Sequence, residues 1–228
     1  MLKLIFHGHA CWELDDGTHR VLIDPFLTGN PLADVGPDSF DKLDAILLTH
    51  GHGDHIGDTE QIAKKTGALV VSNFEIASYY GNKGCEAHPM HIGGGREFPF
   101  GHVKWTIAHH GSTGPEGEAL GNPMGVVVTM AGRRVYHAGD TGLFLDMELI
   151  GDVNGPLDVA LLPIGDNFTM GIVDAAKAAE LLRAKVNIPM HYDTFDPIKV
   201  DVAEFVTRVM QHGGKTVVVQ PGETHELA

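Results

Sequence analysis

Four side chains that can bind metal ions lie within six residues of one another: His50, His52, Asp54 and His55. Neutral imidazole and carboxylate groups are common metal ligands. The apolar residues 45–48 directly precede them, which predicts a buried strand that ends at the ligands. In an extended chain His50 and His52 point to the same side, whereas on a helix they would lie about 200° apart. The spacing predicts one ion on His50 and His52 and a second on Asp54 and His55.

A polar loop whose histidines face solvent is the alternative interpretation of this segment. Gly51, Gly53 and Gly57 alternate with the four candidate ligands and allow the backbone to curl. The whole chain also has 15 histidines beside only 2 cysteines. This excess favours metal binding over a plain surface loop.

The charge of the chain restricts its partners. The formal net charge is −14, from 16 Lys and Arg against 30 Asp and Glu, and the longest basic cluster is Arg133-Arg134. Nucleic acid binding depends on basic side chains that neutralise phosphates, so we expect a small-molecule substrate instead. The N-terminal apolar run breaks at His7, and no stretch approaches the about 18 apolar residues of a membrane span. We therefore expect a cytoplasmic protein that does not enter membranes; a homo-oligomer is compatible with the sequence.

Short apolar runs bounded by turn residues predict strands at residues 2–6, 21–23, 45–48, 68–71, 103–107, 125–130, 159–162 and 216–219. Capping residues and apolar spacing predict helices from Asp58 to Gly67, from 174 to 185 and from Asp201 to Gly213. No linker or repeat divides the chain, so residues 1–228 are expected to form one domain. The mixture of elements favours packed sheets with helices outside them.

The motif His-x-His-x-Asp-His after a strand resembles the signature of the metallo-β-lactamase superfamily. Residues 139–144, 163–171 and 188–192 are, more narrowly, similar to segments of small prokaryotic metal-dependent hydrolases that resemble ascorbate-6-phosphate lactonases. The resemblance covers most of the chain. It implies an α+β fold, a four-layer αββα sandwich, with a dinuclear metal site.

The resemblance also implies the remaining ligands. His110 would complete the first ion, Asp140 would bridge both ions, and His191 would complete the second. His109 and His110 are adjacent and point opposite ways in an extended chain, so only one can face the metals; the resemblance favours His110, and spacing alone leaves both open. Asp140 could instead cap a helix, and His191 could be a buried core histidine. His137 is expected to be structural.

Four further residues are candidates for the surroundings of the site. Asp24 ends a buried strand, where an unpaired carboxylate is costly. The resemblance gives it the role of accepting the free N–H of a ligand imidazole. His9 resembles a histidine near the substrate pocket, with a surface histidine as the alternative. Asp166 and Asn167 are expected either to line the substrate pocket or to form a turn.

The activity implied is that of a metal-dependent hydrolase with Asp54 and Asp140 as catalytic residues. Metal binding can lower the pKa of water from about 15.7 to about 7, and we expect the bridging hydroxide to attack a carbonyl or phosphoryl centre. The substrate would be a small lactone, ester or phosphodiester, anionic ones included. Zinc is the default metal, with manganese, iron or nickel as alternatives. Rival functions on the same fold are a di-iron redox protein, whose members usually carry glutamate in place of His52, and a non-catalytic metal-binding protein.

Overall fold

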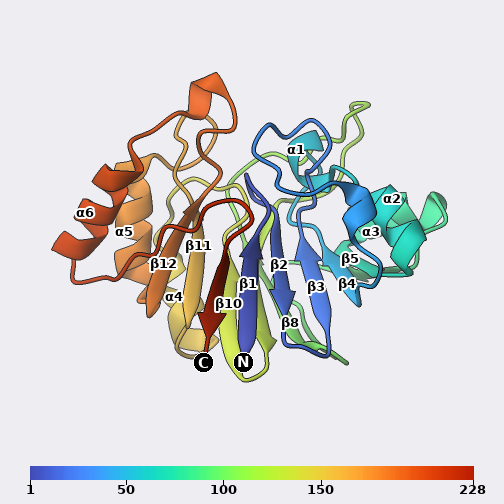
Figure 1. Ribbon diagram of the computed structural model, residues 1–228, viewed down its shortest axis with the longest axis horizontal. Coiled ribbons are helices and arrows are strands. Elements are labelled where there is room, and N and C mark those ends of the chain that lie inside the picture. The colour runs from blue at the N-terminus through green and yellow to red at the C-terminus, as the bar shows by residue number, and fades with distance from the viewer.

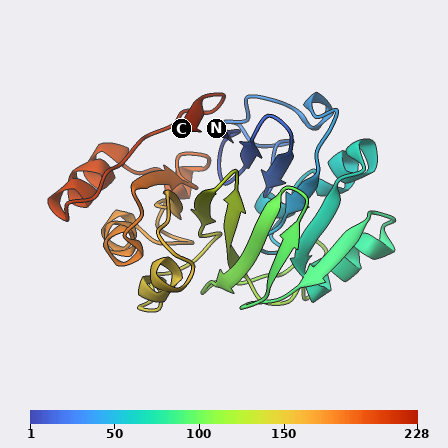
Figure 2. The same ribbon diagram turned by 90° about the horizontal axis from the view of Figure 1, so that it is seen from below.

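In the computed structural model, which describes residues 1–228, the strands form two sheets that lie face to face (Figures 1 and 2). The first sheet contains β1 Leu2–Phe6, β2 Trp12–Asp15, β3 Arg20–Ile23, β4 Ala45–Leu47, β5 Leu69–Asn73, β6 Ala87–Met90 and β13 Thr224–Leu227, in the order β13-β1-β2-β3-β4-β5-β6. The second contains β7 Gly95–Phe98, β8 Gly101–Ile107, β9 Met124–Met130, β10 Arg133–His137, β11 Val159–Pro163 and β12 Val186–Met190, in the order β12-β11-β10-β9-β8-β7.

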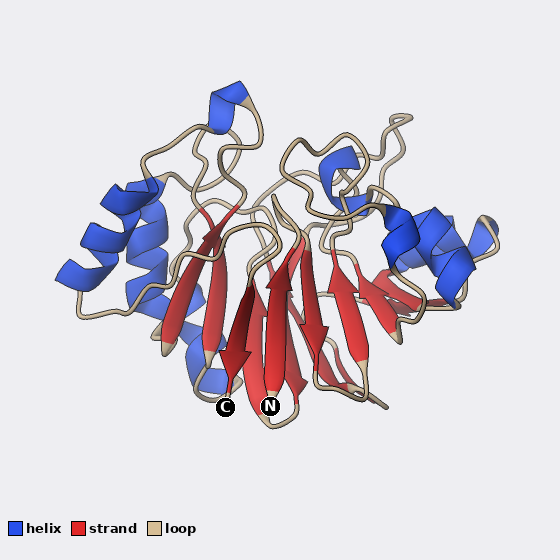
Figure 3. Ribbon diagram, viewed as in Figure 1, coloured by secondary structure: helices blue, strands red, loops and turns tan.

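The helices lie outside the two sheets (Figure 3). They are α1 Gly53–Ile56, α2 Thr59–Thr66, α3 Phe74–Asn82, α4 Met147–Val153, α5 Ile172–Leu182 and α6 Val202–Gln211, with short 3₁₀ turns at Pro37–Ser39 and Asp196–Ile198. α2 and α3 contact β5 of the first sheet, and α5 contacts β11 of the second. None of these helices has the length and apolar character that a membrane crossing requires.

Alternation of apolar side chains along the strands explains the layers. Successive residues of a strand point to opposite faces of its sheet. On β9, Val126 and Val128 join the core between the sheets, whereas Val127 joins the cluster beneath α4, α5 and α6. On β3, Val21 faces the central core and Leu22 faces the helix layer of the first sheet. Both sheets are thus apolar on both faces, and the expected four-layer αββα sandwich is confirmed.

The strand directions bring the loops that carry the candidate site residues to one edge of the sandwich. β3 and β4 are parallel, and β1 has the same direction because it is joined to β3 through antiparallel β2. In the second sheet β10, β11 and β12 are parallel, and β8 shares their direction through antiparallel β9. The loops that follow β1, β3, β4, β8, β10, β11 and β12 therefore leave at the same edge, the upper one in Figure 1.

The structure differs from the predicted elements at several places. The predicted strand at 216–219 is wrong, since it contains only an isolated bridge between Asn187 and Thr216. The chain must cross there from the second sheet to β1, with which β13 pairs, so it cannot follow β12. The helix predicted from Asp58 does span Thr59–Thr66, but the Asp58 carboxylate accepts the backbone N–H groups of Leu27 and Thr28 rather than capping it.

Candidate metal centre

The loop after β4 carries four of the candidate ligands. His50 and His52 precede α1, whose single turn contains Asp54 and His55. Gly51 between the two histidines is required by a close approach, because a Cβ there would lie 2.7 Å from the Leu120 side chain. This contact presses the loop after β8, which contains Leu120, against the loop after β4.

A first cluster contains His50, His52 and His110, whose ligand atoms all lie within 4.8 Å of one another. His50 Nε2 lies 3.1 Å from His52 Nδ1. Two nitrogens bound to one zinc at about 2.0–2.1 Å in a tetrahedron lie roughly 3.3 Å apart, so this spacing suits a shared ion. His110 joins the cluster, whereas the neighbouring His109 is exposed and packs on Phe144 with ring centroids 5.0 Å apart.

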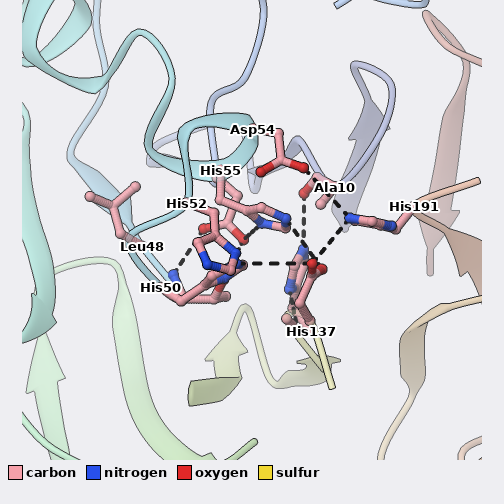
Figure 4. A network of polar contacts seen from close by, with 12 residues as sticks. Ala10, Leu48, His50, His52, Asp54, His55, His137 and His191 are labelled. Atoms are coloured by element: carbon pink, nitrogen blue, oxygen red, sulfur yellow. Dashed lines mark hydrogen bonds and ion pairs between the residues drawn. The ribbon is translucent and has the colours of Figure 1, made fainter. Parts of the chain in front are cut away.

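A second cluster contains His9, Asp54, His55 and His191, again with ligand atoms within 4.8 Å of one another. Figure 4 shows Asp54, His55 and His191 of this cluster. The His9 ring nitrogen Nε2 donates to Asp54 Oδ2 at 3.2 Å, and its Nδ1 lies 2.8 Å from Thr194 Oγ1. The His9 side chain has no exposed surface. The structure therefore places His9 behind Asp54, within the cluster, although the sequence suggested a place near the substrate.

The carboxylate of Asp140 reaches both clusters. Its Oδ1 lies 3.2 Å from His55 Nε2, and its Oδ2 lies 3.1 Å from His191 Nε2 and 3.4 Å from His110 Nε2. Asp140 follows β10 at the centre of the second sheet, opposite the loop after β4. One side chain from the second sheet thus links the imidazoles of two separate groups.

Asp24 sets the orientation of two of the imidazoles. Its buried carboxylate accepts the backbone N–H of Thr49 at 2.8 Å, the Thr49 hydroxyl at 2.6 Å and the His55 Nδ1–H at 2.8 Å. The Thr49 hydroxyl oxygen in turn accepts from His50 Nδ1 at 3.0 Å. These bonds place a ring proton on Nδ1 of both His50 and His55, so that Nε2 is the nitrogen of each ring that faces the clusters.

His137 also lies close by, but its ring nitrogens are both used within the protein (Figure 4). Nε2 donates to the Ala10 carbonyl at 2.9 Å, and Nδ1 accepts the backbone N–H of Gly139 at 3.1 Å. His137 therefore ties the loop of His9 to the loop of Asp140 without offering a free lone pair, as expected for a structural histidine.

Burial and neighbouring charges set the protonation of the centre. Burial lowers the pKa of His50 well below its usual value and that of His9 to about 4, and it also lowers the pKa of His110. Burial opposes ionisation of Asp140, but the neighbouring His191 and His55 hold its pKa well below the usual range. Neutral imidazoles beside an ionised carboxylate are in the protonation state that binds metal ions.

The carboxylates around His55 favour a positive charge at the centre. Burial lowers the pKa of His55, yet the carboxylates of Asp140 and Asp24 outweigh burial and raise this pKa well above its usual value. Buried polar atoms rarely lack a partner. Here His55 Nε2, Asp140 Oδ1 and His191 Nε2 are all buried without a hydrogen bond. A divalent cation would satisfy these three atoms, and a set of imidazoles and carboxylates suits zinc, iron, manganese or nickel.

A hollow of about 240 Å³ opens over the clusters and is lined by His52, Asp54, His110, Asp140, Phe168 and His191. Asp166 lines a different hollow beside Val200 and Glu204, and Asn167 is exposed; the structure does not bring either of them to the metal clusters. Phe168 was not among the residues predicted for the site. An isolated aromatic residue between polar turn residues was its only signal in the sequence.

The αββα sandwich, with two histidine clusters at one edge, places the chain in the class of metallo-β-lactamase-fold proteins. A family model described as a beta-lactamase superfamily domain matches residues 19–192. The chain is 51% identical over 232 residues to a UPF0173 metal-dependent hydrolase of Bacillus velezensis, covering 100% of both. It is also 51% identical over 231 residues to YtkL of Bacillus subtilis, likewise called a metal-dependent hydrolase, covering 99% of this chain and 100% of that one. The chain therefore belongs to the beta-lactamase superfamily and, within it, to the UPF0173 family of metal-dependent hydrolases.

Solved structures agree with this assignment. Igni18, a metallo hydrolase of the hyperthermophilic archaeon Ignicoccus hospitalis, is 38% identical with a TM-score of 0.91, covering 100% of this chain and 99% of that one. An isothiocyanate hydrolase from Delia radicum gut bacteria has a TM-score of 0.78 at 22% identity, covering 99% of each chain. At that identity the second structure shows a shared fold alone.

Proposed function

We propose that the chain is a dinuclear hydrolase that attacks a carbonyl or phosphoryl centre of a small substrate. The observation that carries the proposal is the position of Asp140, whose two oxygens face His55 on one side and His110 on the other. A closed structural zinc site uses four protein ligands around one ion. A carboxylate shared by two clusters beneath an open hollow suits two ions with positions left for water and substrate.

In this proposal each cluster holds one ion. His50, His52 and His110 bind the first, while Asp54, His55 and His191 bind the second, and Asp140 bridges both. His9 acts through its hydrogen bond to Asp54. Zinc is the metal we favour, because nitrogen and oxygen ligands in this number suit it. A cytoplasmic location and the absence of nucleic acid partners stay predictions.

Two divalent ions, when bound, would polarise the substrate oxygen and bring the pKa of a coordinated water from about 15.7 to about 7. The side chain of Asp54 is partly exposed to the hollow, with 32% of its surface accessible. Burial opposes its ionisation, but the hydrogen bond from His9 lowers its pKa, so Asp54 is a carboxylate at neutral pH. An ionised carboxylate has about four lone pairs, so Asp54 can keep the bond from His9, bind the second ion and also orient the attacking water and accept its proton.

Metal analysis and a substrate panel test the proposal together. Zinc-loaded protein should contain two equivalents of zinc and hydrolyse at least one class among lactones, phosphodiesters, thioesters and a β-lactam. Asp140→Asn should lower that activity by more than the about 10–100-fold typical of changes outside the ligand shell. Asp158→Asn is the matched control, because Asp158 is also buried but accepts from Lys185 and Arg134 at the opposite edge. Full activity of Asp140→Asn, or one zinc per chain in the wild type, would contradict the dinuclear mechanism.

A further inference from the structure

Phe168 presents an aromatic ring to solvent at the wall of the metal hollow. Its residue surface is 56% exposed, among the few large apolar side chains left open to water. It is also the only apolar residue among those that line the hollow. Single exposed apolar side chains are common on protein surfaces, so the distinguishing feature of Phe168 is its position at the mouth of the metal site.

A tight turn directly before Phe168 sets its position. Asp166 and Asn167 have φ values of +61° and +49°, a left-handed conformation that Asp and Asn adopt more readily than other residues with side chains. Two bonds brace the turn: Asp166 N–H donates to the Met170 carbonyl at 3.1 Å, and Met170 N–H donates to the Thr141 carbonyl at 3.0 Å. Thr141 follows Asp140 in the chain. The second bond therefore ties the turn that carries the Phe168 ring to the segment that carries the Asp140 carboxylate.

The charges around the hollow disfavour a substrate that carries a carboxylate or phosphate outside the group that is hydrolysed. Its lining residues include two carboxylates and three histidines but no lysine or arginine. Lys199, on the loop after β12, does not line the hollow, and its ammonium group pairs with Asp196 at 2.7 Å. A carboxylate or phosphate held beyond the scissile group would lose water without gaining a cationic partner, which is costly.

The hollow is open to solvent, and its volume is sufficient for one ring. An apolar cavity of about 150 Å³ accommodates benzene. The hollow here measures about 240 Å³, below the about 300–1,000 Å³ of pockets for drug-sized ligands. The space therefore suits one ring together with the group that reacts.

We propose that Phe168 is a specificity-determining residue and that the substrate carries one uncharged aromatic or similarly compact apolar group that packs on its ring. The inference rests on the proposed hydrolase function, whose site it describes further. It assigns Asp166 and Asn167 to the turn that presents Phe168.

Binding of metal-chelating hydroxamates to zinc-loaded protein tests this without requiring turnover. Acetohydroxamate, benzohydroxamate and 4-carboxybenzohydroxamate share the chelating group and differ only in the attached group, and calorimetry would give the Kd of each. We expect benzohydroxamate to bind about 2- to 12-fold more tightly than acetohydroxamate, the range for one aromatic contact. In Phe168→Ala that ratio should approach one, and the carboxylated ring should bind more weakly than the plain ring in the wild type.

Phe74→Ala is the matched control, since Phe74 is 58% exposed and begins α3, away from the hollow. It should keep the wild-type ratio. An unchanged ratio in Phe168→Ala, or tighter binding of the carboxylated ring, would overturn the inference. Hydrolysis of benzyl acetate against methyl acetate is the second arm. A ring preference in binding that depends on Phe168, with neither these esters nor any member of the substrate panel hydrolysed, would support the inference while rejecting the proposed function.

Discussion

Replacing Asp24 by asparagine should weaken metal binding at both clusters, although Asp24 lies behind the ligands. Its side chain is completely buried, and its Oδ2 accepts from the Thr49 hydroxyl and from His55 Nδ1. Asparagine has the same shape, but one of its two terminal groups is an NH₂ donor. With the amide oxygen kept on the Thr49 backbone N–H, that NH₂ would face two groups that now donate.

The conflict is relieved by moving two protons. His55 can accept at Nδ1 if its proton moves to Nε2. The Thr49 hydroxyl can accept from the amide if it turns its hydrogen toward His50 Nδ1, which lies 3.0 Å away. His50 then also carries its proton on Nε2. Each change puts a proton on the nitrogen that must bind an ion, so one substitution affects both clusters.

The expected loss of metal affinity can be taken from other proteins in which a residue that hydrogen-bonds to a metal ligand was replaced. Changes just outside the ligand shell typically cost about 10–100-fold in metal affinity, which is about 1.4–2.7 kcal/mol. Because the relay reaches His50 and His55, each of the two zinc equivalents should weaken by at least about tenfold. In the metal-free protein, Asp24→Asn should lower the free energy of unfolding by only about 1–3 kcal/mol, because hydrogen bonds to a charged acceptor are replaced by hydrogen bonds to a neutral one.

Competition with a zinc chelator would give the affinity of each equivalent, and urea unfolding in the presence of chelator would give the stability of the metal-free protein. Asp158→Asn is again the control: it should reduce stability without changing zinc affinity. If Asp24→Asn bound both equivalents within twofold of the wild type, the tautomer argument would be wrong.

Three other predictions concern the frame of the site and its charges. Gly57→Ala should lower the free energy of unfolding by about 1–3 kcal/mol or more, because φ is +28° and a Cβ would lie 2.4 Å from the Pro25 carbonyl oxygen; urea unfolding checks this, and Gly36→Ala, with open space around it, should be neutral. Added zinc should raise the unfolding free energy of the wild type by about 2.7 kcal/mol for each site at 100 times that site's Kd, measured by thermal unfolding, and Asp140→Asn should respond less. Burial opposes ionisation of Glu13, but His7 and Arg20 lower its pKa below the usual 4.5, so its contribution to stability should be present at neutral pH and decline as pH falls below about 4.5. Comparing unfolding of the wild type and Glu13→Gln from pH 7 downward isolates this contribution, and identical pH profiles would contradict it.

The sequence predicted the layers better than the connections between them. Runs such as 125–130 are apolar on both faces, as a strand between a core and a helix layer must be, and β9 occupies them. Edge strands carry no such signal: β7 is mostly exposed and reads as a loop. The apolar run at 216–219 failed for a related reason, because Val219 enters the core while crossing between sheets rather than in a strand. The apolar residues at 216–219 correctly indicated burial. The backbone conformation of this segment depends instead on its next step, the crossing to β1 of the first sheet.

The same distinction applies to the site. His50, His52, Asp54 and His55 are local in the chain, so their spacing alone predicted a shared location. His9 follows β1 in the first sheet and His191 follows β12 in the second. Their rings lie 4.0 Å apart only because the two sheets lie face to face and both loops leave at the same edge of the sandwich. The backbone contact that seals this junction, from His191 N–H to the His9 carbonyl at 2.8 Å, spans nearly the whole chain. Local spacing contains no trace of such a contact, which is why His9 was placed near the substrate rather than within the second cluster.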